Sequence, residues 1–112
     1  MSRSPRIAVY PGTFDPVTLG HLDVLRRASR LFDRVIVAVA PSDAKHPWFS
    51  LAERLTMAKE ATRGIRNVQV RTLDGLTVEF ARRHKAAALI RGLRKFSDFE
   101  RSEEHTSELQ SH

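Results

Sequence analysis

The stretch Ile7-Ala-Val-Tyr-Pro-Gly-Thr-Phe-Asp-Pro-Val-Thr-Leu-Gly-His21 decides the fold of this chain. Its first four residues are a short run of apolar β-formers, which predicts a strand that ends at a Pro-Gly pair. The glycine lets backbone approach a ligand closely, and the prolines stiffen the loop. Thr18 can then cap a helix and place Gly20 and His21 in its first turn. Free N–H groups and the positive end of the helix dipole lie there, so this junction is suited to phosphate.

His21 would add a movable hydrogen-bond donor beside those N–H groups. A single histidine in a first turn is more often a cap or a surface residue than a ligand contact. The glycine-rich loop, the buried strand and the helix start coincide here, which favours the functional interpretation.

The rest of the chain alternates between strand and helix patterns. Val35–Ala40 is a continuous run of β-branched residues and alanine, typical of a strand buried on both faces. The capping box Ser50-Leu-Ala-Glu53 opens a helix. This order predicts an α/β fold with a Rossmann-like parallel sheet and helices on both faces. The other expected elements are helices at 22–32 and 76–84, a helix beginning at Ser97, and strands at 68–73 and 87–90.

Ligands of such sheets bind beyond the carboxyl ends of the strands. The loops after Tyr10, Ala40, Leu73 and Ile90 should therefore carry the function.

Composition narrows the class of protein. The chain has 112 residues, 41% of them hydrophobic and 29% charged, which suits one globular domain and excludes general disorder. It has no cysteine, so disulfides, thiolate metal sites and cysteine nucleophiles are excluded. Residues 1–100 hold eighteen Lys and Arg against ten Asp and Glu, a charge of +8 that predicts an anionic partner. Neither a membrane span nor a signal peptide is recognisable, so we expect a cytoplasmic protein.

Two further loops at the expected ligand edge carry cations. Lys45 follows the second strand and can hold a phosphate as a point charge. Arg91 and Arg94 flank Gly92 after the fourth strand; arginine binds phosphate through two parallel hydrogen bonds, and the glycine leaves room for a nucleotide. Solvated surface charge is the alternative explanation for each of these cations.

Metal binding is suggested only weakly. Asp15, Asp98 and Glu100 are candidates to hold Mg²⁺ through water, although helix capping is the commoner role for the last two. We predict no metal site formed by protein ligands.

The motif at the first helix start is neither a P-loop nor a dinucleotide fingerprint, since G-x-x-x-x-G-K-[ST] and G-x-G-x-x-G are both absent from the sequence. Thr18-Leu-Gly-His21 instead resembles the T/H-x-G-H signature of the nucleotidyltransferase superfamily. With Tyr-Pro-Gly-Thr-Phe-Asp-Pro at 10–16, Lys-His-Pro at 45–47 and Leu-Ile-Arg-Gly-Leu-Arg at 89–94, the chain resembles the bacterial phosphopantetheine adenylyltransferase family from about Arg6 to Glu100.

The resemblance implies transfer of AMP from ATP to 4′-phosphopantetheine, assisted by Mg²⁺, in a cytoplasmic enzyme that is typically a homohexamer with no nucleic-acid or membrane partner. It also implies that His21 contacts the ATP phosphates and stabilises the transition state as the catalytic residue. The other residues that the resemblance places on ATP are Thr13, Phe14, Gly92, Leu93 and Arg94, and those that it places on phosphopantetheine are Thr13, Lys45, Thr77 and Arg91.

The last twelve residues break the pattern. A helix beginning at Ser97 should continue an apolar stripe, yet Leu109 is the one large apolar residue after Glu100. The segment also resembles a translated sequencing adapter. We therefore expect the N-terminal part of a nucleotidyltransferase domain at 1–100 and a non-native tail at 101–112, without the family's Ser/Thr-rich triphosphate loop, last strand and C-terminal helices.

Three alternatives stay open. The acceptor can be another phosphorylated compound, such as nicotinamide mononucleotide or glycerol phosphate, although Tyr10 and the Arg-Gly-Leu-Arg block favour phosphopantetheine. The positive charge also allows a basic nucleic-acid-binding domain, but no recognisable module of that kind is present. The third alternative is an inactive, truncated fragment.

Overall fold

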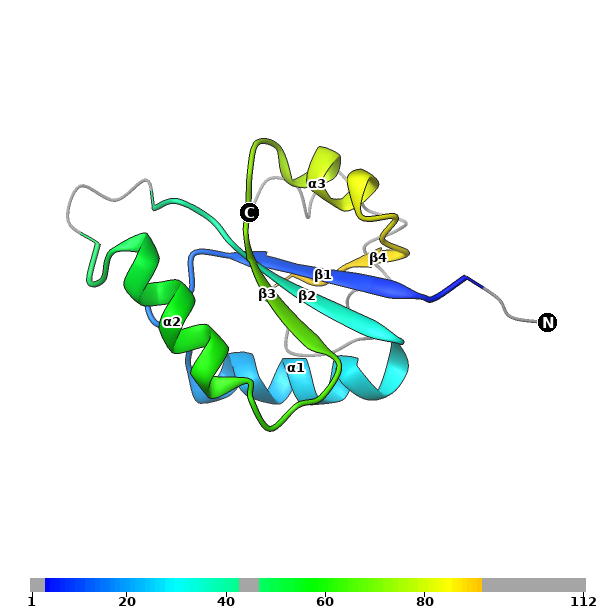
Figure 1. The fold of residues 1–112 in the computed structure, drawn as a ribbon, viewed down its shortest axis with the longest axis horizontal. Helices are drawn as coiled ribbons and strands as arrows, with labels where there is room; N and C mark the ends of the chain where they lie inside the picture. The colour runs from blue at the N-terminus through cyan, green and yellow to red at the C-terminus, as the bar shows by residue number, and fades with distance from the viewer. Residues whose placement is uncertain (1–3, 43–46, 92–112) are drawn as a thin grey trace.

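The computed structural model describes residues 4–42 and 47–91, which form a four-stranded parallel sheet in the order β3-β2-β1-β4 (Figure 1). The predicted alternation of strands and helices is confirmed over these residues, and the helix expected from Ser97 lies outside them. The strands are β1 (Ile7–Gly12), β2 (Arg34–Val39), β3 (Val68–Thr72) and β4 (Ala88–Leu89), and the helices are α1 (Leu19–Leu31), α2 (Leu51–Ala61) and α3 (Thr77–Arg83).

Helices cover both faces of the sheet, as the sequence predicts (Figure 1). α1 and α2 lie on one face, where Leu25 packs into a cluster with Val35 and Val37 of the central strand β2. α3 lies on the other face, where Phe80 joins a second cluster with Ile36. Alternate residues of β2 therefore enter opposite clusters, which explains why the strand is apolar throughout.

β1 extends two residues further than predicted, through Pro11 and Gly12. Proline is rare in a central strand because it cannot donate to a neighbouring strand. The Val9 carbonyl accepts a hydrogen bond from Ile90 N–H, so the alternate residues of β1, Pro11 among them, turn their backbone polar groups towards β4. β4 ends at Leu89, level with Val9, so the missing N–H of Pro11 falls beyond the paired region.

α1 is fixed to the sheet along its length. Its buried residues are Leu22, Leu25 and Ala28, as the helical spacing predicts. At its far end, the Asn67 side chain donates hydrogen bonds to the carbonyl groups of Ser29 and Phe32, at 2.8 and 3.0 Å. These bonds satisfy carbonyls that a helix end otherwise leaves open, and they hold α1 against the start of β3.

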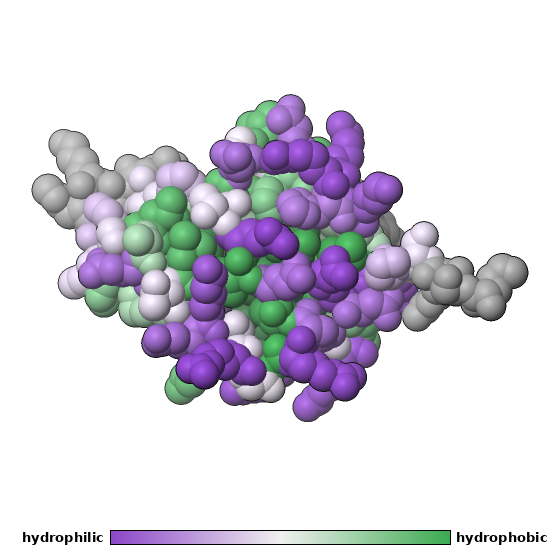
Figure 2. All heavy atoms as spheres, in the orientation of Figure 1, coloured by the Kyte–Doolittle hydropathy of each residue, from purple (hydrophilic) through white to green (hydrophobic). Residues whose placement is uncertain are grey.

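Hydrophilic side chains cover most of the face seen in Figure 2, and hydrophobic residues show between the helical layers, over the strands and near α2. None of the helices within residues 4–42 and 47–91 is long and apolar enough to cross a bilayer.

Candidate active site

The chain reverses its direction of travel across the sheet at β1. From β1 it passes through α1 to β2 and then to β3, and afterwards it returns through α3 to β4 on the other side of β1. The carboxyl ends of β1 and β4 therefore form the topological switch point, where α/β sheets bind ligands. The loop between β1 and α1 begins at this point, and Arg91 follows β4 beside it.

α1 begins with a capping box in which a histidine takes the place of the usual glutamate. The Thr18 side chain accepts a hydrogen bond from the His21 backbone N–H at 3.2 Å. In return, the Thr18 backbone N–H donates to His21 Nδ1 at 2.9 Å. The predicted cap and the predicted position of His21 in the first turn are therefore confirmed.

The capping box also decides which nitrogen of the His21 ring carries the proton. A backbone N–H can only donate, so Nδ1 must be the acceptor and the neutral ring carries its proton on Nε2. Ring contacts at 4.8 Å to Phe14 and 6.0 Å to Tyr10, between centroids, hold the imidazole in place. The site thus presents an oriented Nε2–H donor.

Burial lowers the pKa of His21 below its ordinary value of 6.5, because desolvation penalises the charged ring. Protonation at Nδ1 would also break the bond from Thr18 N–H. At neutral pH the ring is therefore an uncharged donor. Phosphate groups placed against it would favour the charged form and raise this pKa again.

We expect the pKa of His21 in the free chain to lie below 6.5, and the neutral ring to be protonated on Nε2. As pH falls through 6.5, the unfolded chain then binds more protons than the folded chain. The contribution of His21 to the free energy of unfolding is therefore largest above pH 6.5 and decreases on acidification. Long-range ¹H–¹⁵N spectra recorded across pH 5–8 measure both properties. A ring protonated on Nδ1, or a pKa above 6.5, would contradict the assignment.

Several backbone N–H groups at this junction donate to no atom of residues 4–42 and 47–91, and four of them matter for a ligand at the start of α1. These four belong to Thr13 and Phe14 in the loop and to Leu19 and Gly20 in the first turn of α1. Leu19 and Gly20 lie at the positive end of the helix dipole, in the same first turn of α1 as His21. The arrangement can bind a phosphate group through several donors at once.

The side chain of Phe14 is turned into the core. Its side chain is only 3% exposed and packs edge-to-face on Tyr10, with ring centroids 5.2 Å apart. Its φ of 48° lies in the left-handed region, which non-glycine residues rarely occupy. Gly12 makes room for the ring, because a Cβ there would lie 3.2 Å from Phe14 Cε2. A contact between Phe14 and ATP, if formed as predicted, uses the N–H group rather than the ring.

Asp15 has a structural role. Its carboxylate accepts hydrogen bonds from the backbone N–H groups of Trp48 and Phe49, at 2.8 and 2.9 Å, and so joins the loop after β1 to the segment before α2. The part of the chain that the structure describes contains no group of three His, Cys, Asp or Glu residues placed to hold a metal ion. Asp98 and Glu100, the other two magnesium candidates, lie outside that part.

Arg54 is a further residue of the site that the sequence analysis did not identify. Although charged, it is only 2% exposed. Its Nη1 donates to the carbonyl groups of Thr13 and Ala40, both at 2.7 Å, and its Nε donates to the Phe49 carbonyl at 3.1 Å. Hydrogen bonds to a charged group contribute about 1.5–3 kcal/mol each, which offsets the cost of burying the guanidinium.

The remaining predicted site residues divide into two groups. Thr13 is exposed in the loop after β1, Thr77 begins α3 on the opposite face of the sheet from α1, and Arg91 is half-buried after β4. These three and His21 follow the carboxyl ends of three strands. The predicted residues that lie outside the described part of the chain are Lys45, Gly92, Leu93 and Arg94.

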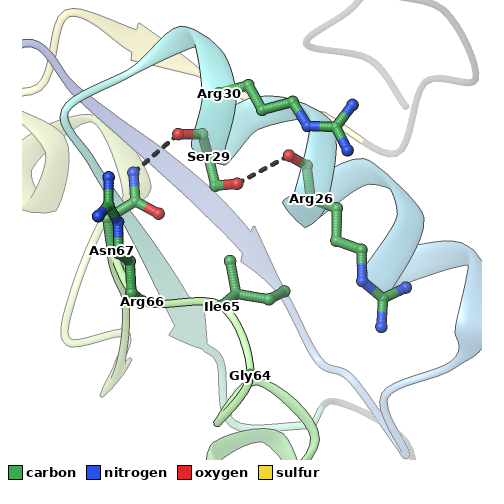
Figure 3. Close-up of a pocket in the computed structure, with 7 residues that line it drawn as sticks. All are labelled: Arg26, Ser29, Arg30, Gly64, Ile65, Arg66 and Asn67. Carbon is green, nitrogen blue, oxygen red and sulfur yellow. Dashed lines mark hydrogen bonds between the residues drawn. The ribbon is translucent and has the colours of Figure 1, made fainter.

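An open cavity of about 480 Å³ lies at the other end of the sheet, near the amino end of β3. It is formed by the last turns of α1 and the segment before β3 (Figure 3). Its arginines do not converge: the side chains of Arg26 and Arg30 extend from α1 on one side, and Arg66 lies on the other (Figure 3). None of the predicted site residues lines this cavity.

Comparisons with known proteins show which family the sequence resembles. The cytidylyltransferase-like family model matches residues 9–112. Phosphopantetheine adenylyltransferase of Campylobacter curvus (strain 525.92) is 56% identical over 95 residues, which are 85% of this chain and 61% of that protein. The enzyme of the same name from Thioalkalivibrio sulfidiphilus (strain HL-EbGR7) is 57% identical over 94 residues, 84% of this chain and 59% of that protein. The chain thus spans about three fifths of the length of these relatives.

Solved structures support the fold. The lipopolysaccharide core biosynthesis protein from Thermoplasma volcanium GSS1 superposes with a TM-score of 0.62 at 24% identity, over 77% of this chain and 73% of that one. The expected similarity to phosphopantetheine adenylyltransferases is confirmed by the two relatives above. Because the family model matches nearly the whole sequence, from Val9 onwards, the chain belongs to the cytidylyltransferase-like family.

Proposed function

We propose that this chain transfers AMP from ATP to 4′-phosphopantetheine, which yields dephospho-coenzyme A and pyrophosphate. One observation carries the proposal: at the switch point of the sheet, the first turn of α1 combines the oriented Nε2–H of His21 with backbone N–H groups that donate to no atom of the described residues. The similarity to phosphopantetheine adenylyltransferases over 85% of the chain supports this choice of substrates.

The reaction needs positioning and charge stabilisation more than proton transfer. A phosphate monoester has a second pKa of about 6, so the attacking phosphate is already ionised at neutral pH. Its oxygen forms a bond to the α-phosphorus of ATP, and the bond from that phosphorus to the bridging oxygen breaks. The electron pair of the broken bond leaves with pyrophosphate. The reaction therefore requires no general base from the protein.

The chain's own residues would hold two anions that repel each other. In this mechanism the Leu19 and Gly20 N–H groups and His21 Nε2–H donate to the ATP phosphates as their charge grows. Arg91, at the end of the neighbouring strand, is assigned to the phosphate of phosphopantetheine. Thr77, which begins α3 on the other face of the sheet, is assigned to the same substrate.

Mg²⁺ enters this proposal only as the counter-ion of ATP. The described residues supply no metal-ligand cluster, and the Asp15 carboxylate is committed to two backbone N–H groups. No step above depends on a bond between the protein and the metal. We further propose that the enzyme acts in the cytoplasm as a homohexamer, without a nucleic-acid partner, as the resemblance to its relatives implies.

Pyrophosphate release tests the choice of acceptor. The chain is incubated with ATP and Mg²⁺, and with 4′-phosphopantetheine, nicotinamide mononucleotide or glycerol phosphate in parallel. We expect release with 4′-phosphopantetheine and background release with the other two. Release that favours another acceptor would assign a different substrate. If no acceptor supports release and calorimetry detects binding of neither ATP nor phosphopantetheine, the proposal is wrong.

A further inference from the structure

The buried guanidinium of Arg54 joins two loops, the one between β1 and α1 and both ends of the one between β2 and α2. It donates to Thr13 in the loop after β1, to Ala40 directly after β2, and to Phe49 before α2. The Asp15 carboxylate reinforces the connection, because it accepts hydrogen bonds from two backbone N–H groups of the segment before α2. Arg54 itself is held by the second turn of a helix whose start is fixed by the Ser50–Glu53 capping box.

The bond to Thr13 has a consequence for ligand binding. The Thr13 carbonyl and the Phe14 N–H belong to one peptide group. A cation that donates to the carbonyl polarises this group and makes its N–H a stronger donor. The Phe14 N–H donates to no atom of the described residues, so its strengthened dipole is available to an anion.

We propose that Arg54 is a positioning residue of the candidate site: it fixes and polarises the Thr13–Phe14 peptide and sets the distance between the loops that follow β1 and β2. It touches no substrate itself and acts through the backbone. The expected effect of Arg54 on kcat rests on the proposed adenylyl transfer.

The substitution Arg54→Lys tests the proposal. Lysine keeps the positive charge but lacks the planar fork that reaches three carbonyl groups. We expect kcat to fall by about 10²-fold, because a displacement near 1 Å at a site of this kind has an effect of that size. KM for phosphopantetheine should change much less. Arg54→Gln, which also removes the charge, should lower kcat further.

Lys59→Gln is the matched control, because it removes one positive charge from an exposed position of the same helix. It should leave kcat and KM unchanged. Circular dichroism and a thermal melt establish that each variant is folded at the assay temperature. A folded Arg54→Lys variant with the kcat of the unchanged chain would overturn the proposal while leaving the adenylyl transfer intact.

A second measurement needs neither activity nor a variant. Pyrophosphate is added to the ¹⁵N-labelled chain, and the Phe14 amide and the Arg54 Nε–H are followed by NMR. We expect a downfield shift of the Phe14 proton and slower exchange of the Arg54 proton with water. If pyrophosphate leaves both unchanged, the positioning role is wrong, even where phosphopantetheine is adenylylated. If both respond but no acceptor is adenylylated, the proposed function fails and the positioning role stands.

Discussion

Replacing His21 with alanine is expected to lower kcat for pyrophosphate release by about 10²–10³-fold, the loss typical of removing one transition-state donor. The Nε2–H of His21 is oriented by Thr18 and by two aromatic rings, and alanine has no side-chain donor to replace it. Steady-state kinetics with saturating ATP and phosphopantetheine measure the effect.

His84→Ala serves as the control for this experiment. His84 ends α3 on the opposite face of the sheet, where it packs against Phe80 with ring centroids 4.3 Å apart. We expect the kcat of the His84→Ala variant to match that of the wild-type chain, once both are shown to be folded. Equal kcat values for His21→Ala and the unchanged chain would remove His21 from the mechanism.

Leu25→Ala is expected to lower the free energy of unfolding by about 2–5 kcal/mol, the range for deleting a fully buried leucine side chain. Leu25 is 0% exposed and joins α1 to the central strands. Domains of this kind have a total stability of about 5–15 kcal/mol, so the loss is a large fraction. Urea unfolding followed by circular dichroism measures it.

Leu31→Ala is the matched control, because this leucine is 54% exposed at the end of the same helix. Its effect should stay within about 0.5 kcal/mol, as for other surface substitutions. Losses of similar size for the two leucines would contradict the packing of α1 against the sheet.

The architecture was predictable because its signals are periodic and local. Buried β-branched runs, the cap at Thr18, the capping box at Ser50, and the helical spacing of Leu22, Leu25 and Ala28 each indicate one element. Element ends were less predictable. β1 can continue through Pro11 because β4 ends before it would need a hydrogen bond from the nitrogen of Pro11. The length of β4 therefore sets the end of β1, and the sequence around Pro11 does not reveal that length.

The candidate site was predicted in part. Its position and the placing of His21 follow from the strand, glycine loop and helix start, which are contiguous in the sequence. Arg54 was missed because its partner Thr13 lies 41 residues away. A signal does exist: Arg54 lies three residues after Leu51 and four before Ala58, on the inward face of an amphipathic helix. A charged residue at a core-facing position suggests a buried polar interaction.

The role of Phe14 shows a second limit of sequence reasoning. The predicted ATP contact of Phe14 did not specify which of its groups would make it, and the ring in fact fills the space above Gly12 and packs on Tyr10. Which part of a residue faces a ligand depends on its φ angle and on packing, and neither follows from the residue type.

The proposed function requires that phosphate binds at the start of α1. Its most direct test is an NMR titration of the ¹⁵N-labelled chain with the complex of ATP and Mg²⁺, with the arginine-lined cavity at the far end of the sheet as the internal comparison (Figure 3). We expect saturable shifts of the Leu19 and Gly20 amides and of His21 Nε2, with a rise in the pKa of His21, while the Gly64 and Asn67 amides stay in place. Shifts confined to Gly64 and Asn67, with the start of α1 unchanged, would contradict the claim.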